Sequence, residues 1–183
     1  MALSGLDLGR DYFELFGQSR AFDVDAGALD TRYRELQALY HPDRHAGGEA
    51  RDRRLAVQAS AWVNEAYQTL KEPGRRARYL LELAGVSFDD ERDTTADPDF
   101  LMRQMALREA LAETAQASEP LFALEDLMRE LRSERDGLYT SFAAAYATGR
   151  LEDAKRTVLQ LRFYARLLDE ANRMAERLED QGD

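Results

Sequence analysis

The last part of the sequence repeats apolar residues in steps of three and four, and this feature constrains the fold most. The repeat runs from Leu151 to about Leu178. Its members are Leu151, Ala154, Val158, Leu161, Ala165, Leu168 and Ala175. Because an α-helix turns once in about 3.6 residues, this spacing lines one side of a long helix with apolar groups. The pattern therefore predicts a helix that packs against other helices.

Two further helices are predicted in the second half of the chain. Asp97 offers a cap, and Pro98 follows it at the first helical position. Pro120 opens the next helix, and Gly149 ends it. Apolar residues again alternate in steps of three and four along that helix, with an interruption at Arg135: Leu124, Met128, Leu131, Leu138, Phe142 and Ala145. Helices joined by short connections predict an antiparallel three-helix bundle over residues 98–183.

The first half is also expected to be helical, so the fold class is all-α. Helices are predicted at about residues 11–16, 25–40, 50–70 and 75–84. Asp11 and Asp25 suit the capping positions of the first two, and Gly17 suits the end of the first. Residues 86–97 are rich in Asp and Thr and lack periodicity, so a linker is expected there. The expected division is 1–85, then the linker 86–97, then 98–183.

Composition excludes several classes of function. The net charge of -10 argues against a nucleic-acid partner, because phosphate contacts need concentrated positive charge. The absence of cysteine excludes disulfides and thiolate metal sites. Residues 1–10 lack the apolar core of a signal peptide, and no apolar run approaches the roughly 20 residues needed to span a membrane. We expect a cytoplasmic protein that contacts no membrane.

The turn between the two long helices of the first half carries the sequence His41-Pro42-Asp43. Proline stiffens the turn, the carboxylate of Asp43 can accept from a partner's donors, and His41 supplies a second polar contact. Together with segments 11–17 and 63–70, this turn resembles a J-domain. The resemblance implies that the three residues engage a DnaK-type chaperone and promote its ATP hydrolysis.

Basic residues near this turn assist the same contact in J-domains, and Arg32, Arg34 and Arg44 are their counterparts here. Two simpler interpretations stay open: the arginines of the preceding helix form an ordinary solvated face, or the turn has no partner at all. A third alternative is a metal site of a hydrolase, because His41, Asp43 and His45 alternate as possible ligands.

The helix that begins at Pro98 has two apolar stripes. One stripe, formed by Phe100, Leu107 and Leu111, can face the bundle. The other contains Leu101, Met102, Met105 and Ala112, with Glu109 on the same side. Phe163 lies outside the apolar stripe of its own helix and is expected to be at least partly exposed unless another element covers it. Such apolar patches mark an interface, unless the first domain packs on them.

Three short segments, Phe100-Leu-Met102, Leu107-Arg-Glu109 and Leu161-Arg-Phe163, make the chain similar to the HscB family of iron–sulfur co-chaperones. Residues 76–81 extend the likeness. In that family the corresponding face binds the scaffold protein IscU. The resemblance implies scaffold contacts at Leu101, Met102, Met105, Glu109 and Phe163. Ala106 departs from the pattern, because the family commonly has an acidic residue there.

The leading hypothesis is a non-enzymatic co-chaperone without a cofactor or bound metal. It would bind IscU, deliver it to the DnaK-type ATPase HscA and stimulate ATP hydrolysis during iron–sulfur cluster assembly. The first alternative is a J-domain protein that recruits a different client. The second is the metal-dependent hydrolase that uses His41, Asp43 and His45. The sequence leaves the oligomeric state open, with a monomer expected.

Overall fold

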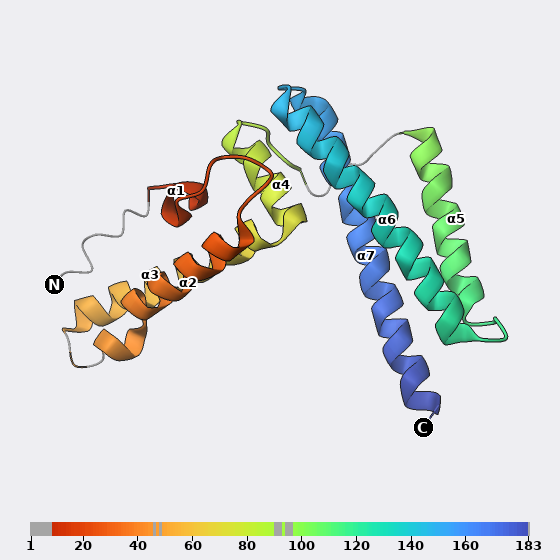
Figure 1. Ribbon diagram of the computed structural model, residues 1–183, viewed down its shortest axis with the longest axis horizontal. Coiled ribbons are helices and arrows are strands. Elements are labelled where there is room, and N and C mark those ends of the chain that lie inside the picture. Colours follow the sequence, from red (N-terminus) through yellow and green to blue (C-terminus); the bar gives the residue numbers. More distant parts are fainter. Residues whose placement is uncertain (1–8, 46, 48, 90–92, 94–96, 183) are drawn as a thin grey trace. The chain divides into compact units, whose positions relative to one another are not determined.

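The computed structural model describes residues 9–45, 47, 49–89, 93 and 97–182 (Figure 1). All regular structure within these ranges is helical, which confirms the all-α prediction. The prediction about a signal peptide rests largely on residues 1–8, and the expected linker contains 90–92 and 94–96. These residues lie outside the described ranges. The chain forms two compact units, residues 1–80 and 81–183.

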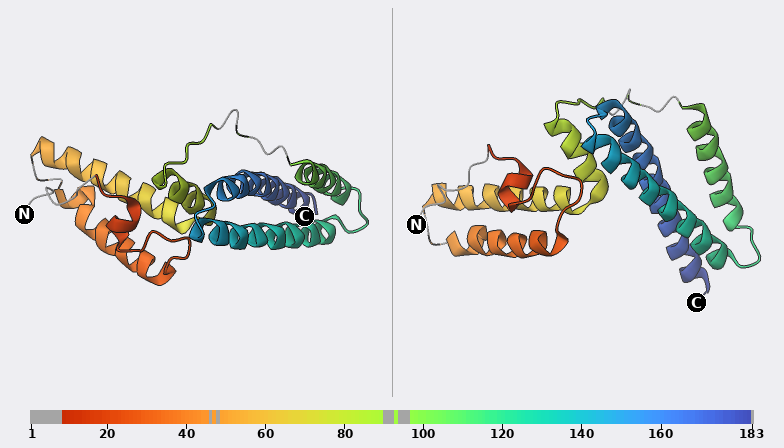
Figure 2. Two further views of the ribbon diagram at one scale, coloured as in Figure 1. Left: turned by 90° about the horizontal axis from the view of Figure 1, so that it is seen from above. Right: turned by 45° about the horizontal axis from the view of Figure 1, so that its top comes forward.

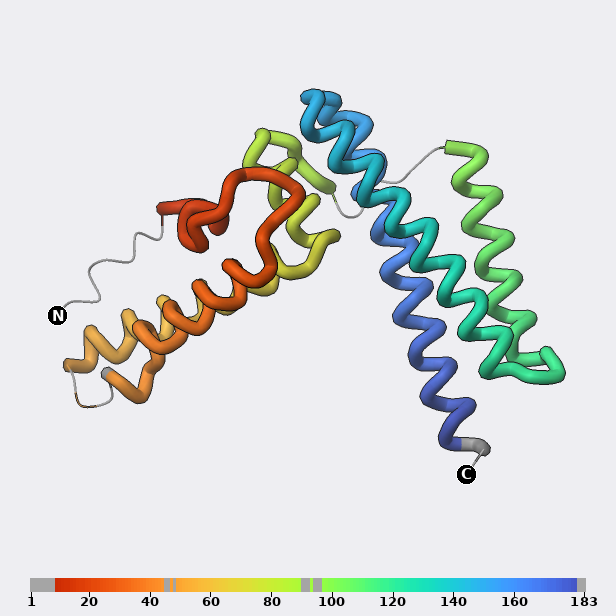
Figure 3. The backbone as a smooth tube through the Cα atoms, in the orientation of Figure 1, coloured from red at the N-terminus to blue at the C-terminus, as the bar shows by residue number. Residues whose placement is uncertain are grey.

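The first unit is built around a helical hairpin. Its described elements are α1 (Tyr12–Phe16), α2 (Ala26–Tyr40), the short 3-10 turn η2 (Pro42–His45), α3 (Ala50–Lys71) and most of α4 (Pro73–Leu83). Helices α2 and α3 run antiparallel and side by side, and η2 lies at the end where they are joined (Figure 3). The hairpin therefore presents the His-Pro-Asp turn at one end.

The predicted caps of α1 and α2 are confirmed. A carboxylate oxygen of Asp11 accepts from the backbone N–H of Glu14 at 2.9 Å, and Asp25 accepts from Ala28 at 2.9 Å. A cap of this kind stabilises a helix by about 1 kcal/mol. Gly17 ends α1 in the left-handed conformation with φ of 64°, which a residue with a Cβ adopts only at a cost.

Helices α2 and α3 are joined by apolar and polar contacts. Leu29, Leu36, Val63 and Leu70 are buried between the helices of this unit. The rings of Tyr33 and Tyr67 stack with 3.9 Å between centroids. The Tyr67 hydroxyl donates to Asp30 at 2.7 Å and accepts from Lys71 at 2.7 Å. These contacts hold α2 and α3 together in the hairpin that carries the turn.

The described part of the second unit contains a bundle of α5 (Pro98–Thr114), α6 (Pro120–Ala147) and α7 (Leu151–Gly182). Helices α6 and α7 lie side by side over most of their length, and α5 packs beside them (Figure 2). Their core consists of Phe100, Leu107, Leu111, Leu124, Leu127, Met128, Leu131, Phe163, Tyr164, Leu167, Leu168 and Ala171. The predicted antiparallel bundle is present.

The predicted stripe of α7 is wrong at one position. Ala165 is exposed, whereas Tyr164 is buried in the core. Residues 164 and 165 are three and four residues after Leu161, so both fit helical spacing. The larger tyrosine takes the buried place because it removes more apolar area from water. No helix in the described part of the chain has an apolar stretch long enough to cross a bilayer.

Candidate functional site

The His-Pro-Asp turn has a defined backbone and exposed side chains. The backbone N–H of Arg44 donates to the His41 carbonyl at 3.1 Å, and the N–H of Asp43 donates to His41 Nδ1 at 3.3 Å. The side chain of His41 is 50% exposed and that of Asp43 is 90% exposed. Pro42 begins η2 directly after α2. Both polar side chains are therefore available to a partner on a constrained backbone.

The three arginines predicted to assist the turn are exposed. Arg44 donates from Nη1 to the Ala38 carbonyl at 2.6 Å, which ties the turn to the last turn of α2. Arg32 forms an ion pair with Glu35 at 2.8 Å. Arg34 donates to acceptors one turn earlier on α2. Each of the three guanidinium groups is thus held by an acceptor on α2.

The metal-site alternative concerned His41, Asp43 and His45. His41 Nδ1 lies 3.7 Å from a carboxylate oxygen of Asp43. The side chain of His45 lies outside the described residues. Among the described side chains, no group of three His, Asp or Glu residues is arranged to hold a metal ion. The described geometry therefore shows a contact between His41 and Asp43 without a third candidate ligand beside them.

Helix α5 has the two predicted apolar stripes. Phe100, Leu107 and Leu111 are buried in the bundle core. On the opposite side, Leu101 is 44% exposed, Met102 63% and Met105 72%, and Glu109 and Ala112 are exposed too. The buried stripe fixes the orientation of α5 in the bundle, so the outer stripe stays on the surface. We call Leu101, Met102, Met105 and Glu109 the α5 face.

The exposure expected of Phe163 in the absence of a covering element is not found, because α5 covers it. Its side chain is only 9% exposed and belongs to the bundle core. Its ring packs edge to face on Phe100 of α5, with 5.8 Å between centroids. The position of Phe163 on α7 suggested exposure, but the spacing along one helix cannot show that another helix covers it.

A cavity of about 310 Å³ lies between α5 and α7. It is lined by Asp93, Leu101, Gln104, Arg108, Leu159, Arg162, Phe163, Arg166, Leu167 and Glu170. Of the predicted scaffold contacts, Leu101 and Phe163 meet at this cavity. Met102, Met105 and Glu109 are not among its lining residues and lie on the exposed side of α5.

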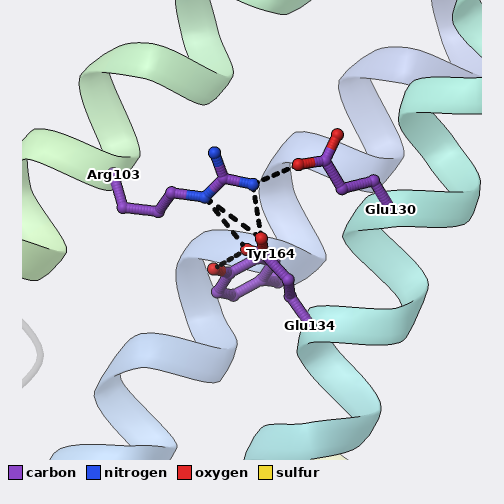
Figure 4. Close-up of polar contacts among 4 residues, drawn as sticks. All are labelled: Arg103, Glu130, Glu134 and Tyr164. Carbon is purple, nitrogen blue, oxygen red and sulfur yellow. Dashed lines mark hydrogen bonds and ion pairs between the residues drawn. The ribbon is translucent and has the colours of Figure 1, made fainter.

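A polar network connects α5 to the other helices of the bundle (Figure 4). Arg103 on α5 donates to Glu130 and Glu134 on α6. The Tyr164 hydroxyl on α7 donates to Glu134 at 2.5 Å. Burial alone would raise the pKa of Glu134, but hydrogen bonds from Arg103 and Tyr164 outweigh it and lower that pKa. Burial and the bond to Glu134 raise the pKa of Tyr164.

Neither this network nor the cavity was predicted from the sequence. The cavity had a signal, since its α7 residues 159, 162, 163, 166, 167 and 170 follow helical spacing. The network had none, because pairing Arg103 with Glu134 requires the relative register of two helices. Exposed Leu121 and Phe122 at the start of α6 were also missed, because the predicted stripe began at Leu124.

The chain is similar to known proteins both in sequence and in structure. A family model described as the HSCB C-terminal oligomerisation domain matches residues 96–172. The Co-chaperone protein HscB homolog of Cupriavidus taiwanensis is 42% identical over 176 residues, covering 96% of this chain and 99% of the relative.

Two solved structures are similar over most of their length. Chaperone HscB from Vibrio cholerae is 37% identical, with a TM-score of 0.84, and the match covers 92% of this chain and 99% of that one. Human co-chaperone protein HscB is 30% identical, with a TM-score of 0.85, and the match covers 91% of this chain and 83% of that one.

Proposed function

Because the chain belongs to the HscB family of co-chaperones, we propose that it binds the scaffold protein IscU and delivers it to the DnaK-type ATPase HscA. It stimulates ATP hydrolysis by that chaperone during iron–sulfur cluster assembly and transfer. ATP is hydrolysed in the active site of the partner chaperone, so this chain needs no catalytic residue or cofactor of its own. We expect the protein to act in the cytoplasm.

The observation that carries the proposal is the exposed α5 face. Three large apolar side chains remain in contact with water although the other side of the same helix is buried. Covering such a patch is favourable, at about 25 cal/mol for each Å² removed from water. Methionine adapts its shape to a partner because its side chain is unbranched and flexible. We assign the scaffold contacts to Leu101, Met102, Met105 and Glu109.

Phe163 has a different role in this proposal from the one its sequence position suggested. Its buried ring supports Phe100 and lines the cavity next to Leu101. It therefore acts on scaffold binding through the shape of the surface around Leu101, and only a small part of the ring is open to contact.

The chaperone contact is assigned to the turn. His41 and Asp43 expose their polar groups, and Pro42 restricts the backbone between them. Arg44 adds positive charge in the turn itself, and Arg32 and Arg34 add it along the preceding helix α2. A hydrogen bond in which the donor or the acceptor is charged is about twice as strong as one between neutral groups. The exposed polar side chains of the turn suit a contact with the chaperone that forms and breaks during each ATPase cycle.

We further propose that the J-domain with its following helix occupies residues 1–85 and the scaffold-binding domain residues 98–183. Residues 86–97 connect them. The boundary between the two compact units lies slightly earlier than residue 85, between residues 80 and 81 within α4. The two sites therefore lie on different parts of the chain, which is what an adaptor between two partners requires.

The test is the steady-state ATPase rate of purified HscA, measured alone, with this protein, and with this protein plus IscU. We expect this protein to raise the rate and IscU to raise it further. A separate titration calorimetry experiment measures binding of IscU. Stimulation of HscA without IscU binding would point to a different client. An unchanged ATPase rate would overturn the proposed role.

A further inference from the structure

The cavity between α5 and α7 is a groove formed by two helical faces. Leu101, Gln104 and Arg108 lie at successive turns of α5. They face the side of α7 that carries Leu159, Arg162, Phe163, Arg166 and Leu167. Its lining combines apolar side chains, Leu101, Leu159, Phe163 and Leu167, with the three arginines Arg108, Arg162 and Arg166.

The charges of the groove differ from those of the chain as a whole. The protein has a net charge of -10, yet three arginines line this one cavity. The guanidinium carbon of Arg108 lies 5.9 Å from the centroid of the Phe163 ring, where the ring face attracts a cation. Of the two acidic lining residues, Asp93 forms an ion pair with Lys155 at 2.9 Å, so Glu170 is the one lining carboxylate set against the three arginines.

The groove is continuous with the α5 face through Leu101, which is 44% exposed and also lines the cavity. A protein that covers the α5 face therefore reaches the mouth of the groove. The volume of the groove, about 310 Å³, lies at the lower end of the range for ligand pockets, about 300 to 1,000 Å³. This space suits a few side chains of an extended segment and is too small for a helix.

We propose that the groove receives an acidic segment of the bound scaffold, in which a carboxylate side chain lies next to an apolar one. This inference rests on the scaffold binding proposed above. The carboxylate pairs with the guanidinium groups of Arg108 and Arg166, whose planar forks match its two oxygens. The apolar side chain lies on Leu101 and Phe163. The arginines thereby select an acidic sequence, whereas Leu101, Met102 and Met105 alone select only an apolar surface.

The test removes the two arginine charges and measures IscU binding by titration calorimetry at low and high salt. The double variant Arg108→Gln and Arg166→Gln should bind about tenfold more weakly at low salt. The difference should shrink to about twofold at 0.5 M salt, because salt screens the charge contribution. The lysine variant, Arg108→Lys with Arg166→Lys, should retain an intermediate affinity.

The matched control is Arg173→Gln with Arg177→Gln, two exposed arginines of α7 that do not line the groove. This pair changes the net charge equally and should alter affinity less than twofold. An equal loss in both pairs would show general charge attraction and would overturn the groove assignment. Circular dichroism and urea unfolding confirm that each variant is folded.

The outcomes separate this inference from the proposed function. If Leu101→Ala weakens IscU binding while the groove variant binds normally, the scaffold role stands and the groove assignment fails. If the wild-type protein does not bind IscU, both fail. A selective and salt-dependent loss in the groove variant supports the acidic segment.

Discussion

Arg103 on α5 donates from Nε to both carboxylate oxygens of Glu134 on α6, at 3.1 and 3.3 Å. The same carboxylate accepts from the Tyr164 hydroxyl of α7 at 2.5 Å. One acidic side chain therefore connects the helices of the bundle. Because Arg103 directly follows Met102, the connection fixes the rotation of α5 and so the direction in which the α5 face points.

Replacing Arg103 with methionine should lower the free energy of unfolding by about 1 to 2 kcal/mol. The methionine retains the packing of the aliphatic stem, but Glu134 loses its main charged donor while partly buried. The Arg103 and Glu134 side chains are 37% and 32% exposed, so water limits the loss. Urea unfolding followed by circular dichroism measures the effect.

The control for this variant is Arg129→Met. Arg129 forms an ion pair with Asp126 on the same helix, and its side chain is 74% exposed. An exposed pair of this kind contributes little, so the change should stay within about 0.5 kcal/mol. Equal destabilisation by both variants would contradict a special role for the Arg103 network.

The stabilisation from Glu134 should depend on pH. Its pKa is lowered in the folded protein from the ordinary value of 4.5, so the unfolded chain binds the proton more readily. The stabilisation is therefore complete above about pH 4.5 and is lost as the pH falls through the lower folded pKa. Wild type should exceed Glu134→Gln in unfolding free energy at pH 7, and the gap should narrow below pH 4.5.

Urea unfolding of both proteins between pH 7 and pH 3 checks this prediction. Other carboxylates titrate in both proteins, so the difference between the two curves isolates residue 134. A gap that widens as the pH falls would mean that burial dominates and that the pKa is raised instead.

Much of the fold could be predicted because its signals are local. Asp11, Asp25 and Asp97 cap helices as expected, since a cap depends on neighbours within three residues. Both stripes of α5 followed from helical spacing alone. The His41 turn was found because its proline and its flanking helices are adjacent in sequence.

The errors concern contacts between helices. Phe163 lies beside the main stripe of α7, so it would be partly exposed unless another element covered it, and Phe100 covers it from α5. Spacing within α7 contains no information about the position of α5. The partner of Arg103 was missed for the same reason, because Glu134 is 31 residues away and on another helix.

The α5 face should be separable from stability. The triple variant Leu101→Ala, Met102→Ala and Met105→Ala should weaken IscU binding at least tenfold, because it removes the apolar contact area. Its free energy of unfolding should change by less than about 1 kcal/mol, since these side chains are exposed in the free protein. Titration calorimetry and urea unfolding measure the two effects. Leu121→Ala with Phe122→Ala is the control, because both are exposed and apolar but lie on α6.

Phe163→Ala should behave in the opposite way. Removing a buried ring from the core leaves a cavity next to Phe100 and should lower the free energy of unfolding by about 3 kcal/mol. Urea unfolding measures this loss, and the exposed neighbour Ala165→Ser is the control, expected within about 0.5 kcal/mol. A stability equal to wild type would show that the ring is not part of the core.

His41→Gln should abolish stimulation of HscA while scaffold binding and helicity stay at wild-type levels. The Asp43 N–H donates to His41 Nδ1 at 3.3 Å, and the side-chain oxygen of glutamine can accept that bond instead. The backbone bond from Arg44 to the His41 carbonyl does not use the side chain, so the turn should keep its shape. Glutamine preserves a polar group of similar length but not the imidazole ring and its two nitrogens, which removes the specific contact with the partner.

The measurement is the steady-state ATPase rate of HscA at increasing concentrations of wild type, His41→Gln and the control Gln58→Ala. Gln58 is exposed on α3 outside the turn, so its variant should stimulate like wild type. Circular dichroism establishes that the variants are equally helical, and calorimetry that IscU still binds. Full stimulation by the glutamine variant would remove the turn from the mechanism, because its exposed imidazole would then make no contact on which hydrolysis depends.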